Sequence, residues 1–366
     1  GWLGPEALLP RAGTGSDGSR TLASVELTEV DLDRLSIDAR STASGGDYFV
    51  ASERGSGVPL IWNVDGNRPR RLTSDITDLA WFNHGTAAIG VAAGQAGDSG
   101  SRIVVTAADI ASTTAYLDHQ YFDPANLGSS ADQRYARPMV SPAGALVSFF
   151  VVDRLSGDVS LWLDTGEGAA EVVAGWTLPV QRALDPPLVA TWASPDTLLF
   201  AMPADWHDGL PQTTAFMRLT LSSDTPQLDE LARIDASRGA KGIVLAELAL
   251  SPDGSLLAYR LRQFDSVSGS NATEDTLHVA GTDNLNQAIE LERGGSSDGL
   301  LWTTAGDQLV AGIRGRIALY SADGRDLAYL SPRGVHASYP LLIGRQVWFE
   351  AVDDRGERVW QVDLEE

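Results

Sequence analysis

The side chains that could carry metal or acid–base chemistry are spread thinly along this chain. It contains five histidines, His84, His119, His207, His278 and His336. No two of them stand at the spacing of metal ligands, and no His-Glu-x-x-His motif occurs. The densest candidate, Asp205-Trp206-His207-Asp208, fits an exposed loop tip without a metal. We therefore predict no metal site and no cofactor, and a site assembled from distant repeats stays open.

Two short motifs match catalytic signatures only in their letters. Gly13-x-Gly15-x-x-Gly18 has the spacing of the dinucleotide-binding fingerprint, but it follows no strand and opens no helix, and that context gives the fingerprint its function. Gly97-Asp98-Ser99-Gly100 resembles the serine loop of trypsin-like proteases, but the expected cysteines are absent. We therefore assign no catalytic residue.

Charge and cysteine content exclude further classes of protein. The chain has 49 acidic and 27 basic residues, with Lys241 as its only lysine, and its net charge is -22. This charge repels phosphate backbones, and no arginine cluster larger than Arg70-Arg71 offsets it, so we predict no nucleic-acid partner. Without cysteine the chain has no disulfide, no thiolate nucleophile and no Cys-based zinc site.

The N-terminal residues differ from the rest of the chain. Residues 1–20 contain two prolines and five glycines and are typical of a flexible arm or linker, whereas residues 21–366 are expected to form a single domain. No apolar run approaches the roughly 20 residues that cross a bilayer. The chain starts at Gly1 without methionine, which leaves open a removed signal or anchor ahead of it.

From Thr21 onward the chain consists of short apolar segments separated by Gly, Asp, Ser and Pro clusters, which predicts an all-β protein. The segments repeat. The clearest copy, residues 248–259, is an apolar strand, the turn Ser251-Pro252-Asp253-Gly254 and a second apolar strand. Weaker copies cover residues 140–147 and 191–200.

A second half-motif, strand then Asp-Gly then strand, covers residues 60–73 and 317–330. Together the halves give a four-stranded antiparallel unit, with strands a to d from inside to outside. This unit resembles the repeat of the TolB-like or WD40-like (PD40-type) β-propeller family over residues 35–366, most closely near 47–73 and 248–261. The resemblance implies a β-propeller of four-stranded blades and an extracytoplasmic interaction protein. The bias toward arginine over lysine and toward alanine and glycine is typical of a GC-rich bacterium.

Laid along the chain, this repeat predicts seven blades, although six or eight stay open. They begin near Leu35, Ile76, Ala136, Pro186, Gly242, Asp298 and His336. The last blade lacks its outermost strand. The segment Thr21 to Leu27 is strand-like and is predicted to fill that place and close the ring, which would protect the sheet edges. The alternative is an N-terminal strand that packs elsewhere.

The aromatic residues divide between core and surface. The tryptophans expected inside strands, most of them in the core, are Trp62, Trp81, Trp162, Trp192, Trp302, Trp348 and Trp360. Trp176 and Trp206 lie beside long loops and are expected to be exposed.

The long loops are predicted between strands b and c of a blade, and between strand d and the next blade. Both kinds of connection leave a blade at the same face. The long loops are residues 93–101, 117–137, 176–187, 203–212 and 264–274. Long loops on a rigid scaffold often carry function, with neutral insertion as the alternative. Because aromatics and arginine anchor interfaces, we predict partner contacts on this face. The predicted residues are His119, Tyr121, Phe122, Arg134, Tyr135, Trp206 and His207.

We therefore favour a monomeric, non-catalytic binding or scaffolding module for a protein, peptide or glycan. A hydrolase or lyase with its site at the channel mouth is the second hypothesis. The sensor ectodomain of a membrane-anchored protein is the third. Fold alone does not choose among them, because function depends on the sites that a fold carries.

Overall fold

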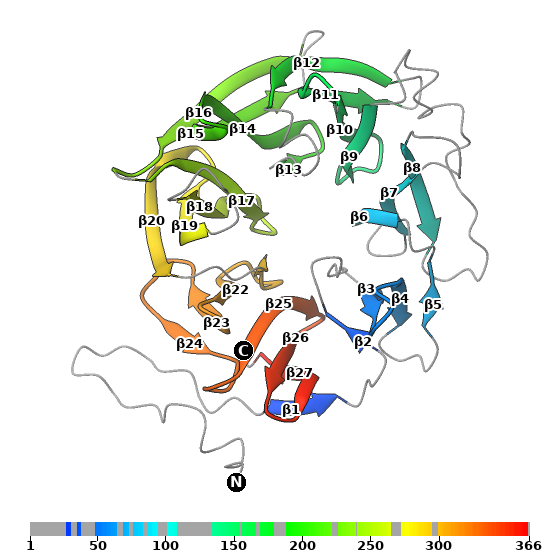
Figure 1. Cartoon of the computed structure of the whole chain (residues 1–366), viewed down its shortest axis with the longest axis vertical. Coiled ribbons are helices and arrows are strands. Elements are labelled where there is room, and N and C mark those ends of the chain that lie inside the picture. The colour runs from blue at the N-terminus through cyan, green and yellow to red at the C-terminus, as the bar shows by residue number, and fades with distance from the viewer. Residues whose placement is uncertain are drawn as a thin grey trace. The chain divides into compact units, whose positions relative to one another are not determined.

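The structure is a computed structural model. It describes residues 27–30, 35–37, 48–63, 69–72, 76–82, 87–93, 101–107, 133–153, 155–165, 169–178, 188–221, 226–238, 240–264, 272–294 and 299–364. Every regular element in these stretches is a β-strand, which confirms the all-β prediction (Figure 1). The strands form seven antiparallel sheets, which are the blades of a seven-bladed β-propeller.

Strands a to d of each blade are hydrogen-bonded in that order. Blade 1 contains β2 (Leu35–Ser36), β3 (Tyr48–Glu53), β4 (Pro59–Asn63) and β5 (Arg70–Arg71), and the described part of blade 2 contains β6 (Ile76–Phe82), β7 (Ala87–Ala93) and β8 (Ser101–Ala107). Blade 3 contains β9 (Gln133–Val140), β10 (Val147–Asp153), β11 (Asp158–Asp164) and β12 (Ala169–Thr177). Blade 4 contains β13 (Ala190–Ser194), β14 (Thr197–His207), β15 (Leu210–Thr220) and β16 (Gln227–Asp235).

The remaining blades follow the same pattern. Blade 5 contains β17 (Gly242–Leu250), β18 (Leu256–Phe264), β19 (Ala272–Gly281) and β20 (Asn284–Gly294). Blade 6 contains β21 (Leu300–Trp302), β22 (Gln308–Ile313), β23 (Arg316–Ser321) and β24 (Leu327–Tyr329). Blade 7 contains β25 (His336–Ile343), β26 (Gln346–Asp353) and β27 (Gly356–Asp363), with β1 (Leu27–Val30) as its outermost strand.

The chain divides into two compact units. The first comprises residues 1–43, 51–57 and 236–366 and holds blades 5, 6 and 7. The second comprises residues 44–50 and 58–235 and holds blades 2, 3 and 4. Each unit has apolar clusters of its own, around Phe349 in the first and around Phe150 in the second.

The predicted blade starts agree closely with the first strands observed. Blades 1, 2, 5 and 7 begin at the predicted residues Leu35, Ile76, Gly242 and His336. Blades 3, 4 and 6 begin within four residues of the predicted positions, at Gln133, Ala190 and Leu300. The Ser-Pro-Asp-Gly and Asp-Gly signals therefore locate each blade well, because they fix the turns between its strands.

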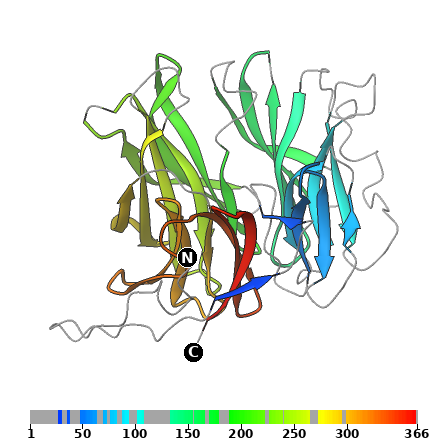
Figure 2. The ribbon, with the colours of Figure 1, turned by 60° about the horizontal axis from the view of Figure 1, so that its bottom comes forward.

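An N-terminal strand does complete the last blade, but with different bounds from those predicted. Strand β1 pairs antiparallel with β27, from Leu27 opposite Val362 to Val30 opposite Val359. In Figure 2 the blue β1 lies along the red β27. The predicted strand, residues 21–27, overlaps β1 only at Leu27, and residues 21–26 lie outside the described part. Both segments are strand-like in sequence, and only the pairing with β27 fixes which one lies beside it.

The repeated turns share one hydrogen-bonding pattern. In the a-to-b turn of blade 5, the Ser251 hydroxyl donates to Asp253 Oδ1 at 2.6 Å and accepts from the backbone N–H of Leu256 at 2.9 Å. In the c-to-d turn of blade 6, Ser321 makes the same contacts with Asp323 at 2.7 Å and with the Asp326 N–H at 2.9 Å. The serine and aspartate of the repeat are therefore explained by turn formation alone.

The seven tryptophans expected in strands all lie in strands. Trp176, expected to be exposed, was predicted wrongly. It lies in β12 with 8% of its surface exposed, and it packs edge-on against Phe150 and stacks on Phe200, with ring centroids 6.0 and 6.2 Å away. The sequence around it resembles a loop start, but the large apolar surface of the indole is buried between blades 3 and 4.

Candidate binding face

The b-to-c turns and the d-to-a connections leave each antiparallel blade at the same end, because strands b and d run in the same direction. We call this end of a blade the long-loop face and the other end the tight-turn face. The a-to-b turns at residues 141–144, 251–254 and 303–306 and the c-to-d turn at 321–324 lie on the tight-turn face. All four are short, and two of them are a-to-b turns predicted to be tight, Ser141 to Gly144 and Ser251 to Gly254.

Residues 203–212, expected to be a loop, form the end of a long hairpin instead. Strands β14 and β15 pair from Thr197 opposite Thr220 to His207 opposite Leu210. The two-residue turn is Asp208-Gly209, with φ of 49° and 76°, which suits a tight hairpin reversal. The prolines suggested a loop, but β13 pairs with β14 only as far as Phe200, so this part of the hairpin tolerates residues without an N–H.

A polar cluster supports the end of this hairpin. The Thr213 hydroxyl lies 2.9 Å from Asp205 Oδ2 and 3.1 Å from Asp235 Oδ1. The Arg233 guanidinium, on the neighbouring strand β16, pairs with Asp205 at 3.2 Å and with Glu230 at 3.0 Å. Asp205 has a left-handed φ of 54°, and these contacts hold its carboxylate in place. The hairpin end is therefore an ordered polar surface at the b-to-c position.

Trp206 and His207, two of the residues predicted to contact a partner, lie at this hairpin end. Trp206 is half-buried and packs against the apolar cluster of the second unit. The His207 side chain is 75% exposed, and its Nε2 lies 3.5 Å from the Asp208 carboxylate. The structure thus brings these two residues to the long-loop face, with His207 as the exposed member.

Two further residues from that prediction lie in a strand. Arg134 and Tyr135 belong to β9, so residues 133–137 of the expected loop 117–137 are a strand instead. Tyr135 is 4% exposed, and its ring packs edge-on against Phe149 with centroids 5.3 Å apart. The prediction placed both residues in a long loop and added their residue types, whereas the strand alternation of β9 buries Tyr135. The remaining three residues, His119, Tyr121 and Phe122, lie outside the described part, and their role stays a prediction.

Three inner strands contain a non-glycine residue in the left-handed region, which the sequence did not reveal. They are Asp78 in β6, Arg137 in β9 and Tyr339 in β25, with φ of 51°, 48° and 51°. Each lies where the register between strands a and b shifts by a β-bulge. Such backbone conformations cost on the order of 1 kcal/mol and persist only when the surroundings hold them.

Carboxylates of one blade hold the inner strand of the next. Asp78 Oδ2 accepts a hydrogen bond from the backbone N–H of Arg137 at 3.1 Å. Glu247 Oε1 accepts one from the N–H of Gly299 at 2.6 Å. The Glu350 carboxylate likewise accepts one from the N–H of Ile37 at 2.8 Å, and burial raises the pKa of Glu350. These acidic residues therefore fix the inner strands from blade to blade.

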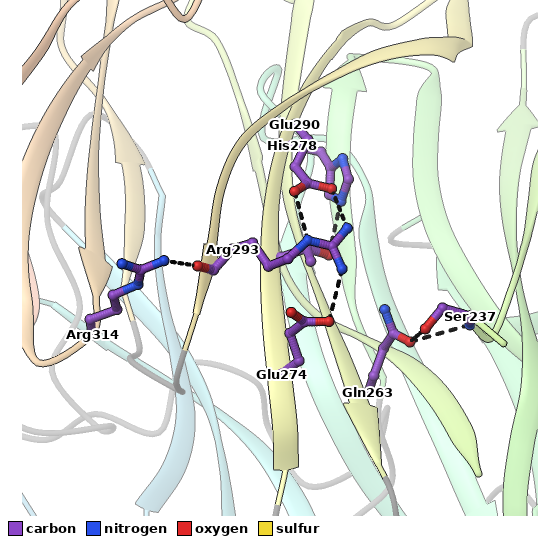
Figure 3. Close-up of polar contacts among 8 residues, drawn as sticks. Ser237, Gln263, Glu274, His278, Glu290, Arg293 and Arg314 are labelled. Carbon is purple, nitrogen blue, oxygen red and sulfur yellow. Dashed lines mark hydrogen bonds and ion pairs between the residues drawn. The ribbon is translucent and has the colours of Figure 1, made fainter. Parts of the chain in front are cut away.

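A charged network covers the outer strands of blade 5 (Figure 3). The Arg293 guanidinium lies between two carboxylates, at 2.6 Å from Glu290 and 2.8 Å from Glu274. Its hydrogen bond lowers the pKa of Glu290. Arg314, in the b-to-c turn of blade 6, donates to the backbone carbonyl of Arg293 and pairs with Glu292 at 2.9 Å. The network links blades 5 and 6 and leaves its carboxylates neutralised by arginine.

His278 lies beside this network and packs as a strand residue. Its imidazole stacks on Tyr259 with centroids 5.1 Å apart, and its Nε2 lies 2.9 Å from the Thr276 hydroxyl. Burial lowers the pKa of His278, which Glu290 partly opposes. The contacts suit a packed strand residue, and none of them is to an activated nucleophile.

The described residues contain no group of three or more His, Asp or Glu side chains placed to hold a metal ion. Among the same residues no helix is long and apolar enough to cross a membrane. Acids that gather on one surface, such as Glu274 and Glu290, instead pair with arginine.

The solved structures with which this chain can be superposed include proteins of different function. An oligogalacturonate lyase in complex with manganese matches with a TM-score of 0.60 at 9% identity, over 94% of this chain and 99% of that one. A second match is the β-propeller domain of the Trilobed protease from Pyrococcus furiosus, described as having an open velcro topology. It superposes with a TM-score of 0.54 at 12% identity, over 90% of this chain and 95% of that one. The likeness is one of fold.

Other matches extend over only part of the compared protein. A prolyl endopeptidase matches with a TM-score of 0.57 at 13% identity, over 79% of this chain but 41% of its own length. The chain thus spans less than half of that enzyme. No family model matches the sequence, and no curated protein matches it. Function has to be argued from the residues of this chain.

Proposed function

We propose that this propeller is a binding module that recognises a protein, peptide or glycan through its long-loop face. The observation that carries the proposal is the β14–β15 hairpin, whose eleven-residue strands extend past the paired part of the five-residue β13. Its end presents the exposed side chains of His207 and Asp208. A rigid two-stranded arm loses little conformational entropy on binding, which favours recognition.

The surroundings of the hairpin support this role. Trp206 holds the hairpin in place by packing on the apolar cluster of the second unit. Thr213 and Arg233 fix the neighbouring Asp205 carboxylate. Polar groups whose positions are set by packing and hydrogen bonds are suited to specific contacts. The resemblance of residues 248–261 to the TolB-like repeat agrees with an interaction protein outside the cytoplasm.

The test compares two variants after a ligand has been found on glycan and peptide arrays. The tip variant combines His207→Ala with Asp208→Asn, because asparagine tolerates the left-handed φ at position 208. The control is Arg325→Ala, an 84% exposed residue of the tight-turn face. We expect the tip variant to bind about tenfold more weakly or worse, as hot-spot side chains do, with an unchanged melting temperature.

The control should bind like the parent protein. Unchanged binding by the tip variant, or weaker binding only in Arg325→Ala, would contradict the proposed face. Release of shortened products from a bound glycan would contradict the non-catalytic role and favour the lyase or hydrolase hypothesis.

A further inference from the structure

Many arginines in the described part of this acidic chain have a carboxylate partner. Eleven of its arginines form ion pairs, namely Arg54, Arg137, Arg218, Arg233, Arg260, Arg262, Arg293, Arg314, Arg325, Arg355 and Arg358. Arg316 and Arg333 form none with any residue that the structure describes. Both belong to the first unit, on the long-loop face of blade 6.

Arg316 is held in one orientation. Its guanidinium lies over the Tyr329 ring, 3.6 Å from the centroid, and Nη2 donates to the Ser331 carbonyl at 2.9 Å. The fully buried Ser331 also accepts the Ile317 N–H through its hydroxyl at 2.9 Å, which fixes this segment against β23. A guanidinium oriented before binding loses little freedom when it meets a ligand.

Arg333 provides a second cation two residues beyond Ser331. It is exposed and precedes Gly334, whose left-handed φ of 82° marks a turn with open space beside it. The Arg316 guanidinium contacts the carbonyl of Ser331, two residues before Arg333, so the chain brings the two cations to the same connection. Burial lowers the pKa of Arg316, and the positive charge of Arg333 lowers it further by repulsion. An anion between them would relieve this repulsion.

We infer that Arg316 and Arg333 form a binding site for an oxyanion, a carboxylate or phosphate group carried by a small ligand. Planar guanidinium groups match both anions with paired hydrogen bonds. A polyanion is disfavoured, because the net charge of -22 would repel it over most of its length. The inference goes beyond the proposed function, because the site lies within the first unit and can be tested without a partner.

The experiment measures the melting temperature and the heat of titration with inorganic phosphate and, separately, with glucuronate. Sodium chloride at equal ionic strength is the reference. The variants are Arg333→Ala and, as the matched control, Arg325→Ala, an exposed arginine of the same blade that pairs with Asp323. Arg316→Lys is a second test that keeps the charge but loses the planar group.

We expect at least one of the two anions to raise the melting temperature above the chloride reference, as ligands that bind the native state do. Arg333→Ala should weaken that binding about tenfold or more, because it removes a charge-assisted contact. Arg316→Lys should also weaken it, and Arg325→Ala should not. Preference for phosphate or for glucuronate identifies the source of the anion.

The inference is overturned if neither anion exceeds chloride, or if Arg333→Ala and Arg325→Ala weaken binding equally. Anion binding at this site together with an inactive hairpin tip would refute the proposed function but not the inference. The reverse result would refute the inference alone.

Discussion

Glu247 and Arg260 form an ion pair that joins strands a and b of blade 5, with Glu247 Oε2 2.7 Å from Arg260 Nε. The arginine side chain is fully buried, and its Nη2 also donates to the Gly312 carbonyl of blade 6 at 2.8 Å. Because Glu247 also accepts the Gly299 N–H, a single carboxylate neutralises a buried cation and holds the next inner strand.

Removing this carboxylate should be costly. Glu247→Ala leaves the Arg260 charge buried without a partner, which should lower the free energy of unfolding by about 3 to 5 kcal/mol. Glu247→Gln keeps an acceptor and should cost less. The control is Glu290→Ala, whose pair with Arg293 is exposed and should contribute less than about 1 kcal/mol. Urea unfolding measures all three, and equal losses for Glu247→Ala and Glu290→Ala would contradict this role.

The turn serine should control the acidity of its aspartate. The Ser251 hydroxyl and the Ser255 N–H lower the pKa of Asp253 to about 2. This depressed pKa contributes stability that is present above the ordinary pKa of 3.8 and is lost as the pH falls toward 2. In Ser251→Ala the pKa of Asp253 should rise, and stability should be lost at a higher pH. NMR titration of the carboxyl carbon measures the change.

The same turn in blade 6 is the internal control for that titration. Ser321 lowers the pKa of Asp323 by the same contact, and Ser251→Ala should leave it unchanged. A pKa of Asp253 that does not move in Ser251→Ala would show that the hydroxyl is not its main partner.

The last blade should depend on β1 and not on the residues before it. Deleting residues 1–31 exposes the edge of β27 and removes the register from Leu27 to Val30, so the melting temperature should fall by several degrees. In a large domain each lost kcal/mol corresponds to about 2 °C. Deleting residues 1–26 should change it little. Scanning calorimetry distinguishes the two, and identical melting of both truncations and the parent would contradict closure by β1.

The sequence predicted what depends on local chemistry. Turn signals such as Ser251 to Gly254 and the apolar segments beside them located the blades, since each turn is formed by its own residues. The contacts of Glu247 with Gly299 and of Asp78 with Arg137 could not be predicted, because each joins residues more than fifty positions apart. The bounds of β1 depend on its register with β27, and the burial of Trp176 depends on its packing against Phe200 of the next blade. Neither can be predicted from neighbouring residues.

The candidate site was predicted in part. The composition of Asp205 to Asp208 indicates an exposed loop tip, and the Asp-Gly pair at its end predicts the hairpin turn that the structure has. Arg316 contacts a carbonyl and an aromatic ring, whereas other arginines pair with carboxylates. The sequence does not show this difference, because it depends on which side chains the fold brings together.

Hydrogen–deuterium exchange of the protein with and without its array-selected ligand tests the long-loop face most directly. Binding there should slow exchange at residues 205–211 in the second unit or at residues 314–316 and 330–336 in the first. Exchange at the tight turns 251–254 and 321–325 should stay the same. Protection confined to those tight turns would contradict the account.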